Sequence, residues 1–349
     1  MQFVCYNAWD QLPKGADALL ATATRKSLFL SRPWFENLIA TSLEPHQTPF
    51  LACVADGPRL LAILPLMTLA NGSYDPLSNH FTTLYSLLLA EEQEQDAIIA
   101  CLVDGLDRLP NRNHRLFPID ADDPNMNRLQ KAMESAGFEC QRHVRFFNWV
   151  HATEGASFAQ YMAARPARLR NTIARKSRKL QREHGYEIRL YMRDDLQQAL
   201  MDYQTVFRAS WKGCEPFADF IPGLVNRAAA RGWVRLAILY IAGEPAAAQL
   251  WFVVHPTASI FRLAYHEAWK RYSPGSILTR HLMEQVIDID KVEKIDFLTG
   301  NDRYKQDWMT QRRERWVLSC AKADQSLGLT ARMAASWNRL RARSQSRGG

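Results

Sequence analysis

Three side chains that could take part in proton transfer follow a short apolar run near the C-terminal end of the chain. Residues 295–298 (IDFL) are apolar apart from one acid, and after Thr-Gly-Asn come Asp302, Tyr304 and Lys305. Polar groups at the end of a buried strand are where α/β proteins often keep their chemistry. A tyrosine can protonate a leaving group, a lysine can stabilise an oxyanion or hold a phosphate, and an aspartate can orient the lysine or accept a proton. The alternative is a structural turn with a Lys–Asp surface pair.

A candidate base lies in the stretch Tyr265-His266-Glu267, at the end of another predicted strand. An amine acceptor is protonated at neutral pH and must lose a proton before it attacks. An imidazole with a pKa near 6.5 suits that task. We therefore take His266 and Glu267 as candidate bases, with a structural histidine as the alternative.

A candidate anion site follows at Arg271-Tyr272-Ser273-Pro274-Gly275-Ser276. Ser273 is a favourable N-cap, Pro274 fits the first helical position, and Gly275 and Ser276 leave backbone N–H groups open at the helix start. Such a helix start can bind phosphate, and Arg271 could add a charge-assisted contact. Plain helix capping is the alternative.

A third candidate site is the stretch SWKGCEPF, residues 210–217. Trp211 offers an apolar or cation–π surface, while Lys212 and Glu215 are charged residues beside Gly and Pro turn signals. We expect this stretch to contact the substrate; a charged loop with an aromatic anchor is the alternative.

The strongest charge signal is a predicted amphipathic helix with a cationic outer face. Residues 165–182 contain eight Lys or Arg and no acid: Arg165, Arg168, Arg170, Arg175, Lys176, Arg178, Lys179 and Arg182. Leu169, Ile173 and Leu180 form a narrow apolar stripe. Like charges on one face repel, so a phosphate-rich partner is favoured, contacted by Arg175, Arg178 and Lys179. Coenzyme A, a nucleotide sugar, transfer RNA and anionic lipid would all satisfy this surface. Aromatic residues are not interleaved with the cations, so we expect no DNA partner.

The sequence pattern predicts the strands and helices that position these residues in both halves of the chain. Three strands are predicted from Val234 onward, then a helix over residues 273–289 whose apolar face carries Leu278, Leu282, Val286 and Ile289, then the strand at 294–298. The first half shows a weaker echo of this plan, with strands near 49–55, 59–69, 114–119 and 138–150 and helices near 91–109 and 125–136. Two similar α+β units in tandem are the simplest account. The predicted domains are residues 1–155, residues 156–322, and a basic amphipathic helix with a disordered tail at 323–349. After Leu318 little strand pattern remains.

Composition limits the classes that remain. The 349 residues exceed the usual size of one hydrophobic core, and the net charge of +8 favours an anionic partner. No segment has the pattern of a membrane span or secretory signal, so a soluble cytoplasmic protein is expected. The six cysteines form no metal or redox motif, so we expect reduced, mostly buried thiols and no metal.

The order of these motifs resembles the GNAT superfamily of N-acyltransferases, and more closely its FemAB-like branch, including the CelD-type proteins associated with cellulose biosynthesis. The matching stretches are SWKGCEPF, GEPAAAQLWF, SPGSIL and DFLTGNDRYKQDW in the second half and FLSRPWF, AILPL and YDPLSNHFTTLYS in the first. The resemblance covers most of residues 25–318. It implies two tandem GNAT-like units, each a mostly antiparallel mixed sheet flanked by helices.

The resemblance also implies roles for the candidate residues. The acyl donor of a GNAT enzyme lies where strands four and five splay apart, and the helix after the fourth strand holds the pyrophosphate of coenzyme A. Arg271, Ser273, Gly275 and Ser276 occupy that helix start, with Pro before the Gly and Ser as the last small residue. Tyr304 is placed like the tyrosine that protonates the leaving thiolate.

The expected function is transfer of an acyl group from acyl-CoA, most simply acetyl-CoA, to an amine or hydroxyl of a small or envelope- or polysaccharide-related acceptor. One alternative is a FemAB-like peptidyltransferase that uses aminoacyl-tRNA. Another is a non-catalytic subunit of a polysaccharide synthesis system that binds polyanions or an anionic membrane surface, which would place the protein at the inner face of the membrane.

Overall fold

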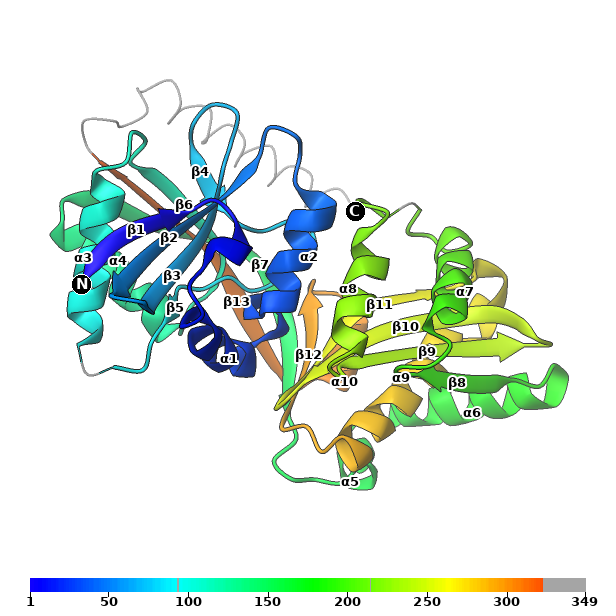
Figure 1. Ribbon diagram of the computed structural model, residues 1–349. Helices are drawn as coiled ribbons and strands as arrows, with labels where there is room; N and C mark the ends of the chain where they lie inside the picture. The colour runs from blue at the N-terminus through cyan, green and yellow to red at the C-terminus, as the bar shows by residue number, and fades with distance from the viewer. Residues whose placement is uncertain (93, 214, 323–349) are drawn as a thin grey trace, which may run out of the picture.

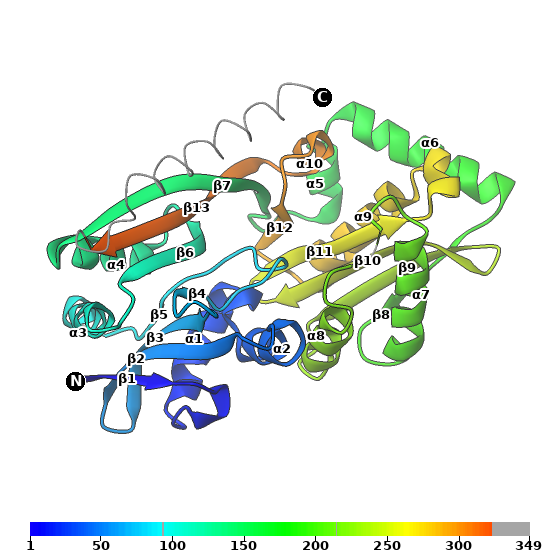
Figure 2. The same cartoon turned by 90° about the horizontal axis from the view of Figure 1, so that it is seen from above.

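The computed structural model describes residues 1–92, 94–213 and 215–322, so the predicted helix and tail at 323–349 lie outside the described residues. The described residues form a 13-stranded sheet, and helices cover its faces (Figures 1 and 2). The strand order is β1-β2-β3-β4-β6-β13-β7-β12-β11-β10-β9-β8, and β5 pairs with β3. The prediction of an α+β fold with a mostly antiparallel sheet flanked by helices is confirmed.

The strands fall into two groups of similar plan. The first half contains β1 (Gln2–Tyr6), β2 (Thr48–Asp56), β3 (Arg59–Thr68), β4 (Tyr74–Pro76), β5 (Leu88–Leu89), β6 (Asn113–Asp120) and β7 (Phe138–Ala152). The second half contains β8 (Glu187–Tyr191), β9 (Val234–Ile241), β10 (Glu244–Val254), β11 (Thr257–Tyr265), β12 (Lys294–Thr299) and β13 (Gln311–Lys322).

Ten α-helices are described between or beside these strands. They are α1 (Ala16–Lys26), α2 (Arg32–Ser42), α3 (Gln95–Asp107), α4 (Pro124–Ser135), α5 (Phe158–Ala163), α6 (Ala167–Glu183), α7 (Leu196–Arg208), α8 (Phe220–Ala229), α9 (Pro274–Glu284) and α10 (Arg303–Trp308). Within the described residues, none of the helices is both long enough and apolar enough to cross a bilayer.

Each half is an antiparallel meander followed by a helix, a strand that pairs in parallel with the meander, a second helix and a last strand. The parallel pairs are β4 with β6 and β11 with β12. The last strands are exchanged, because β7 of the first half pairs with β12 and β13 of the second half pairs with β6. β7 and β13 also pair with each other along their length and so join the halves. The predicted boundary between residues 155 and 156 stays a prediction.

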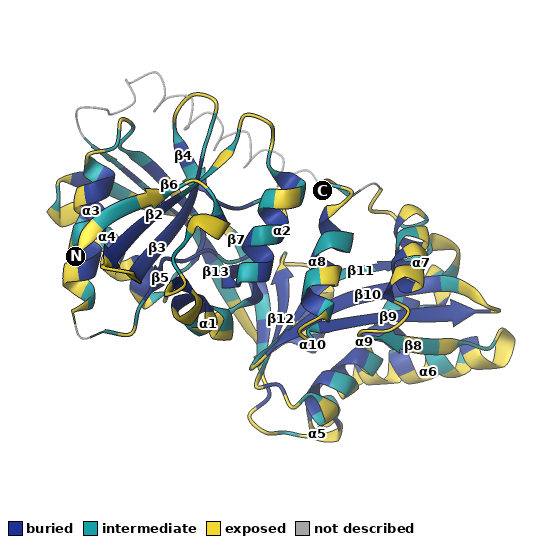
Figure 3. Cartoon of the chain, in the orientation of Figure 1, coloured by how far each residue is buried: buried dark blue, intermediate teal, exposed yellow. Residues whose placement is uncertain are grey.

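The second half buries both faces of its central strands. All eight residues of β9 are buried, as expected for a continuous apolar run covered on both sides (Figure 3). Alternate residues enter different cores: Leu236 and Ile238 pack with α7 and α8, whereas Ala237 and Leu239 pack with α6 and α9. One core therefore holds α7 and α8 on one face of the sheet, and the other holds α6 and α9 on the opposite face.

The predicted crossover helix is present but ends differently from the prediction. Its residues Leu278, Leu282 and Val286 are buried as predicted, but Ile289 is 70% exposed. Residues 285–289 form a π-helical turn, which is wider than an α-turn and shifts the following side chains around the axis. The core position expected for Ile289 is filled by Val292, which is 3% exposed.

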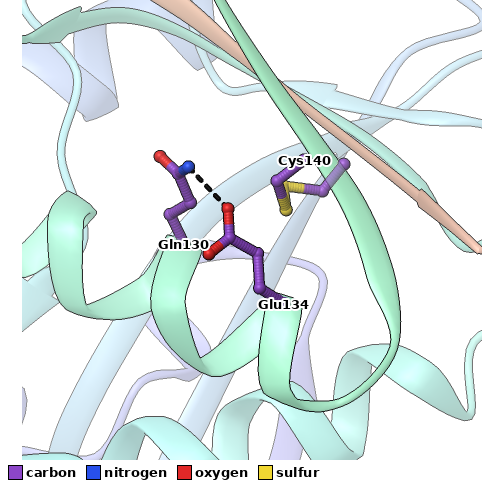
Figure 4. Close-up of a disulfide and its surroundings, with 4 residues drawn as sticks. Gln130, Glu134 and Cys140 are labelled. Carbon is purple, nitrogen blue, oxygen red and sulfur yellow. Dashed lines mark hydrogen bonds between the residues drawn. A yellow bond between two sulfur atoms is a disulfide. The ribbon is translucent and has the colours of Figure 1, made fainter.

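The cysteine prediction is wrong for one pair. Cys140 and Cys320 lie opposite each other in the β7–β13 register and form a disulfide (Figure 4). The expectation of little strand pattern after Leu318 is wrong, because β13 continues to Lys322 between β6 and β7. Cys53 is buried and free, as predicted, whereas free Cys5 is exposed.

Candidate active site

The central feature of the second half is a parting of two parallel strands. β11 and β12 pair at three positions, from Thr257 with Lys294 to Ser259 with Asp296, and then diverge (Figure 1). At its far end β12 pairs instead with β7, through Thr299 and Asn148. We call residues 260–265 of β11 and 297–299 of β12 the strand fork.

The side chain of Lys305 donates hydrogen bonds to backbone carbonyls on the β12 side of the fork. The register of β12 against β7 shifts between Asp296 and Thr299, and Leu298 has a positive φ of 52°. The Lys305 ammonium donates hydrogen bonds to the carbonyls of Phe297 (3.0 Å) and Thr299 (2.6 Å). It is 4% exposed, and burial lowers its pKa. These bonds satisfy carbonyls that the irregular strand end would otherwise leave without partners.

Tyr304 lies beside Lys305 in α10 but faces solvent more than Lys305 does. Tyr304 is 43% exposed, and its ring lies 6.3 Å from that of Phe297. Partial burial and then the negative charge of Asp302 raise the pKa of its hydroxyl. Asp302 is exposed, with its carboxylate 3.9 Å from the Lys305 ammonium. Tyr304 therefore keeps its proton across the neutral range, as a proton donor must.

The β11 side of the fork carries an arginine that the sequence analysis missed. Arg262 donates a hydrogen bond of 2.6 Å to Glu215, which also accepts one of 2.9 Å from the Tyr203 hydroxyl. The guanidinium lies 4.7 Å from the ring centroid of Phe81, which comes from the first half. Its one signal in the sequence is an arginine inside the apolar strand SIFRLAY. Glu215 is therefore part of a partly buried ion pair, and removing one partner would leave a poorly solvated charge.

Trp211 and Lys212 lie near the end of β11. The Trp211 ring is 52% exposed and contacts Tyr265, the last residue of β11, with ring centroids 4.6 Å apart. The Lys212 ammonium lies 5.5 Å from the Trp211 ring centroid. Desolvation and then the positive charge of Arg262 lower the pKa of Lys212 to about 8. The positive charge of Lys305 lowers this pKa further and the negative charge of Asp302 opposes the shift, so Lys212 lies within electrostatic reach of the residues that follow β12.

The start of α9 adjoins Tyr265 and offers an open backbone donor. A Cβ added at Gly275 would lie 3.3 Å from Cδ1 of Tyr265. Pro274 has no N–H, and the N–H groups of Ser276 and Ile277 bond to the carbonyl of Ser273. Within the described part of the chain, the N–H of Gly275 therefore stays available for a ligand.

Ser273 occupies the cap position in an unexpected conformation. Its backbone is left-handed (φ 54°, ψ 48°), and its side chain makes no capping hydrogen bond. The left-handed residue joins α9 to the preceding 3-10 helix, Glu267–Tyr272. A left-handed serine costs about 1–2 kcal/mol, a cost that recurs at functional sites.

A buried amide fixes the position of this helix start relative to the sheet. Gln249 of β10 is fully buried and donates to the Gly275 carbonyl (2.8 Å) and the Thr279 hydroxyl (2.8 Å). Its own side-chain oxygen accepts a 2.9 Å hydrogen bond from Trp251. Every group of this network is satisfied, so it holds the first turn of α9 firmly.

Arg271 is bound within the protein and is not a free cation. Its guanidinium donates to the Tyr272 hydroxyl at 2.7 Å and lies over the same ring. Its carbonyl accepts a hydrogen bond from Lys176 of α6, and Lys179 lies 5.6 Å from the Tyr272 ring centroid. The C-terminal half of α6 therefore packs on the turn that precedes α9.

The predicted cationic helix is confirmed as α6, with Leu169, Ile173 and Leu180 as its buried residues. Arg175, Arg178 and Lys179 lie on its outer part. Arg178 also lines a groove of about 720 Å³ between α5, α6 and α9, together with Arg170 and Arg280.

The candidate bases have other contacts. The Nδ1 of His266 accepts the Ala268 N–H at 3.1 Å and caps the 3-10 helix. Glu267 is exposed and lies 3.5 Å from Lys270. The structure therefore brings Trp211 and the start of α9 together at Tyr265 and places Glu215 on Arg262 of β11, while both candidate bases are engaged elsewhere. No group of three His, Cys, Asp or Glu side chains in the described residues could hold a metal ion.

The fold is similar to several solved structures, and part of the sequence matches a family model. The structure of FemX superposes with a TM-score of 0.62 at 8% identity, over 91% of this chain and 97% of that one. The structure of L-PGS from Bacillus licheniformis gives 0.58 at 12% identity, over 93% and 96%. At such identities the likeness shows a shared fold. No curated protein matches the sequence. Residues 167–306, which contain the fork and α9, match the family model of the acetyltransferase (GNAT) domain.

Proposed function

We propose that this protein is an acyltransferase that takes its acyl group from a coenzyme A thioester, most simply acetyl-CoA, and passes it to an amine or hydroxyl. The supporting observation is the strand fork with the open start of α9 beside it. The Gly275 N–H would meet the pyrophosphate, and the acyl arm would lie between β11 and β12. The acceptor would be a small molecule or an envelope or polysaccharide precursor, as the CelD-type resemblance implies.

In the proposed reaction the acceptor nitrogen or oxygen attacks the thioester carbon and forms a new bond to it. The carbon–sulfur bond then breaks, and Tyr304 donates its proton to the leaving thiolate. Trp211 and Lys212 would line the approach of the substrates, and Asp302 would keep the tyrosine protonated. Lys305 would act by holding the end of β12 in place, because two of its three N–H groups already bind carbonyls. His266 or Glu267 would remove the acceptor's proton only after giving up its present contact with the Ala268 N–H or with Lys270.

The test is a binding screen on the full-length protein. Coenzyme A and acetyl-CoA should each raise the melting temperature in a concentration-dependent way, because a ligand of the native state stabilises it by mass action. Nucleotide sugars and transfer RNA serve as the comparison ligands. Stabilisation by transfer RNA with no response to coenzyme A would contradict the proposed donor.

Aminoacyl-tRNA is the second candidate donor, and the cationic face of α6 is the observation that favours it. Reversal of Arg175, Arg178 and Lys179 to Glu should then weaken transfer RNA binding and flatten its salt dependence by roughly 0.7 in log–log slope for each phosphate that is no longer neutralised. A matched triple reversal of Lys14, Arg128 and Lys131, which are exposed elsewhere, should leave the slope unchanged. Equal effects of the two reversals would assign the α6 face to ordinary solvation.

The same cationic face supports a third proposal, a non-catalytic subunit that binds polyanions or an anionic membrane surface. We place the protein in the cytoplasm, with the inner face of the membrane as the alternative. Acetyl-CoA turnover with any acceptor would exclude the non-catalytic proposal.

A further inference from the structure

A second cationic site lies at the closed end of the strand fork, far along the strands from Tyr265 and Thr299. A pocket of about 350 Å³ forms where β11 and β12 still pair and where β7 and β13 run beside them. Its lining includes four cationic side chains, Arg25, Lys26, Lys294 and Arg313, and one acid, Glu293. Arg25 and Lys26 come from the last turn of α1, so both halves of the chain contribute.

Lys294 distinguishes this pocket from an ordinary charged surface, because its ammonium is partly buried and has no direct partner among the described residues. It is half-buried, and its ammonium makes no hydrogen bond or ion pair with another described residue. Burial lowers its pKa, and Arg313 lowers it further, against the opposing effect of Asp296. A partly desolvated ammonium without a direct partner is unfavourable unless a ligand supplies the negative charge.

Arg313 has unused hydrogen-bonding capacity at the same place. Its Nε is buried and has no hydrogen-bond partner in the described part of the chain. One terminal nitrogen lies 3.9 Å from Asp120, but that carboxylate is held at 2.5 Å by Arg315. The Arg313 side chain is 36% exposed, so its terminal nitrogens can be reached by a carboxylate or phosphate in the pocket.

We propose that this pocket binds a compact multivalent anion, a phosphorylated or polycarboxylated small molecule. The charge of the lining fits such a ligand, and the volume lies near the lower end of the range of about 300–1,000 Å³ typical of small-molecule sites. The proposal does not depend on the acyl-donor site, which lies at the other end of the fork.

The experiment is a thermal-shift titration of the full-length protein with inorganic phosphate and with citrate, each compared with chloride at the same ionic strength. At ten times the dissociation constant, the bound anion should raise the melting temperature by roughly 2–4 °C. A response to phosphate alone, to citrate alone or to both supports the site and defines the chemistry it prefers. No response beyond chloride to either anion overturns the proposal.

Variants locate the response. Lys294→Gln should weaken the responding anion at least about tenfold, whereas Lys131→Gln, an exposed charge-matched change on α4, should not. The double variant Arg25→Gln/Lys26→Gln alters exposed residues at the end of α1 and decides the question should Lys294→Gln fail to fold. Gly275→Asp should keep the response. A response that survives both pocket variants, or that disappears in Gly275→Asp, places the anion elsewhere and overturns the proposal.

Discussion

The two halves of the molecule place a parallel strand pair at the same point of their topology but treat it differently. In the second half β11 and β12 part after three pairs and leave the fork. In the first half β4 and β6 pair only through Tyr74 and His114, and the segment after β4 occupies the neighbouring space. Tyr85 of that segment is 1% exposed, bonds through its N–H to the Pro118 carbonyl (2.6 Å) and donates its hydroxyl to the Pro65 carbonyl (2.8 Å).

The helices that follow these strand pairs differ in charge as well. α3 is preceded by Glu91, Glu92 and Glu94 and has Asp96 in its first turn. α9 is preceded by Arg271 and has no acid in its first turn. Acids at a helix start stabilise the helix itself but repel an anionic ligand. The repeated topology therefore offers two equivalent places. Of the two helix starts, that of α9 has no acid in its first turn and keeps the Gly275 N–H open, as an anionic donor would need.

The largest expected effect concerns proton donation at the open fork. Tyr304→Phe should lower kcat by about 10²–10⁴-fold and leave the dissociation constant of the donor near its original value, because the hydroxyl is lost and the ring stays. Steady-state kinetics and calorimetric donor binding measure the two quantities. Tyr161→Phe is a control, since that buried tyrosine bonds to the Trp308 carbonyl and has no place in the proposed chemistry. Parental turnover of Tyr304→Phe would remove the tyrosine from the mechanism.

The next effect concerns the filled position in the first half. Tyr85→Ala should lower the free energy of unfolding by about 3–5 kcal/mol, the usual cost of truncating a large buried aromatic residue. Tyr85→Phe should cost only about 1 kcal/mol, because the Pro65 carbonyl keeps the N–H of Leu77 as a donor. Urea denaturation measures both.

Tyr85 lies in the first half, away from the proposed donor site. The affinity of the folded Tyr85 variants for coenzyme A should therefore stay within about twofold of the parent, a change of less than about 0.5 kcal/mol. A large loss of affinity would mean that the first half takes part in donor binding, and the contrast between the halves would have to be abandoned.

A third prediction tests the start of α9 directly. Gly275→Asp should weaken coenzyme A binding about 100-fold, because it puts a carboxylate where the helix start should meet phosphate. Gly275→Ala is the matched control: its Cβ would lie 3.3 Å from Tyr265, so a small movement of that ring accommodates it. If alanine and aspartate weaken binding equally, the effect is steric and the pyrophosphate site is wrong.

The local pattern of apolar residues predicts individual strands and helices, but it does not predict which strands pair with one another. Buried strands such as β9 and the amphipathic helix α6 follow from runs and periods of apolar residues within one short stretch. The sequence of β13, QRRERWVLSCAK, begins with five polar residues and has no clear alternation of polar and apolar residues. Its position in the sheet is set by pairing with β6 and β7, which lie about 170–200 positions earlier in the chain. The Cys140–Cys320 disulfide was missed for the same reason, because only the register of β7 with β13 brings the two cysteines together.

The candidate site shows the same division. The motif order predicted a site from the residues after β12, residues 211–215 and the start of α9. In the structure Trp211 and Gly275 both adjoin Tyr265, while the site itself stays a prediction. The contacts that assign each side chain could not be read from the sequence. Lys305 was expected to stabilise an oxyanion or hold a phosphate, yet its ammonium binds two carbonyls at an irregular strand end. Arg262 looked like part of a core strand, yet it holds Glu215 at the fork.

The smallest expected effect is a pH dependence of donor binding that arises from Lys212. Its pKa is lowered to about 8, so it is charged at pH 7 and mostly neutral at pH 9. If its charge attracts the anionic donor, affinity should fall as the pH rises through 8, by roughly fivefold for an interaction of about 1 kcal/mol. Lys212→Arg stays charged throughout and should bind with little pH dependence, whereas Lys212→Met should bind weakly at both ends of the range. Calorimetric titrations with coenzyme A from pH 7 to pH 9 at constant ionic strength separate the three. If the affinity for coenzyme A changes with pH equally in the parent and in Lys212→Arg, a group other than Lys212 titrates. The charge contrast between the halves would then rest on the start of α9 alone.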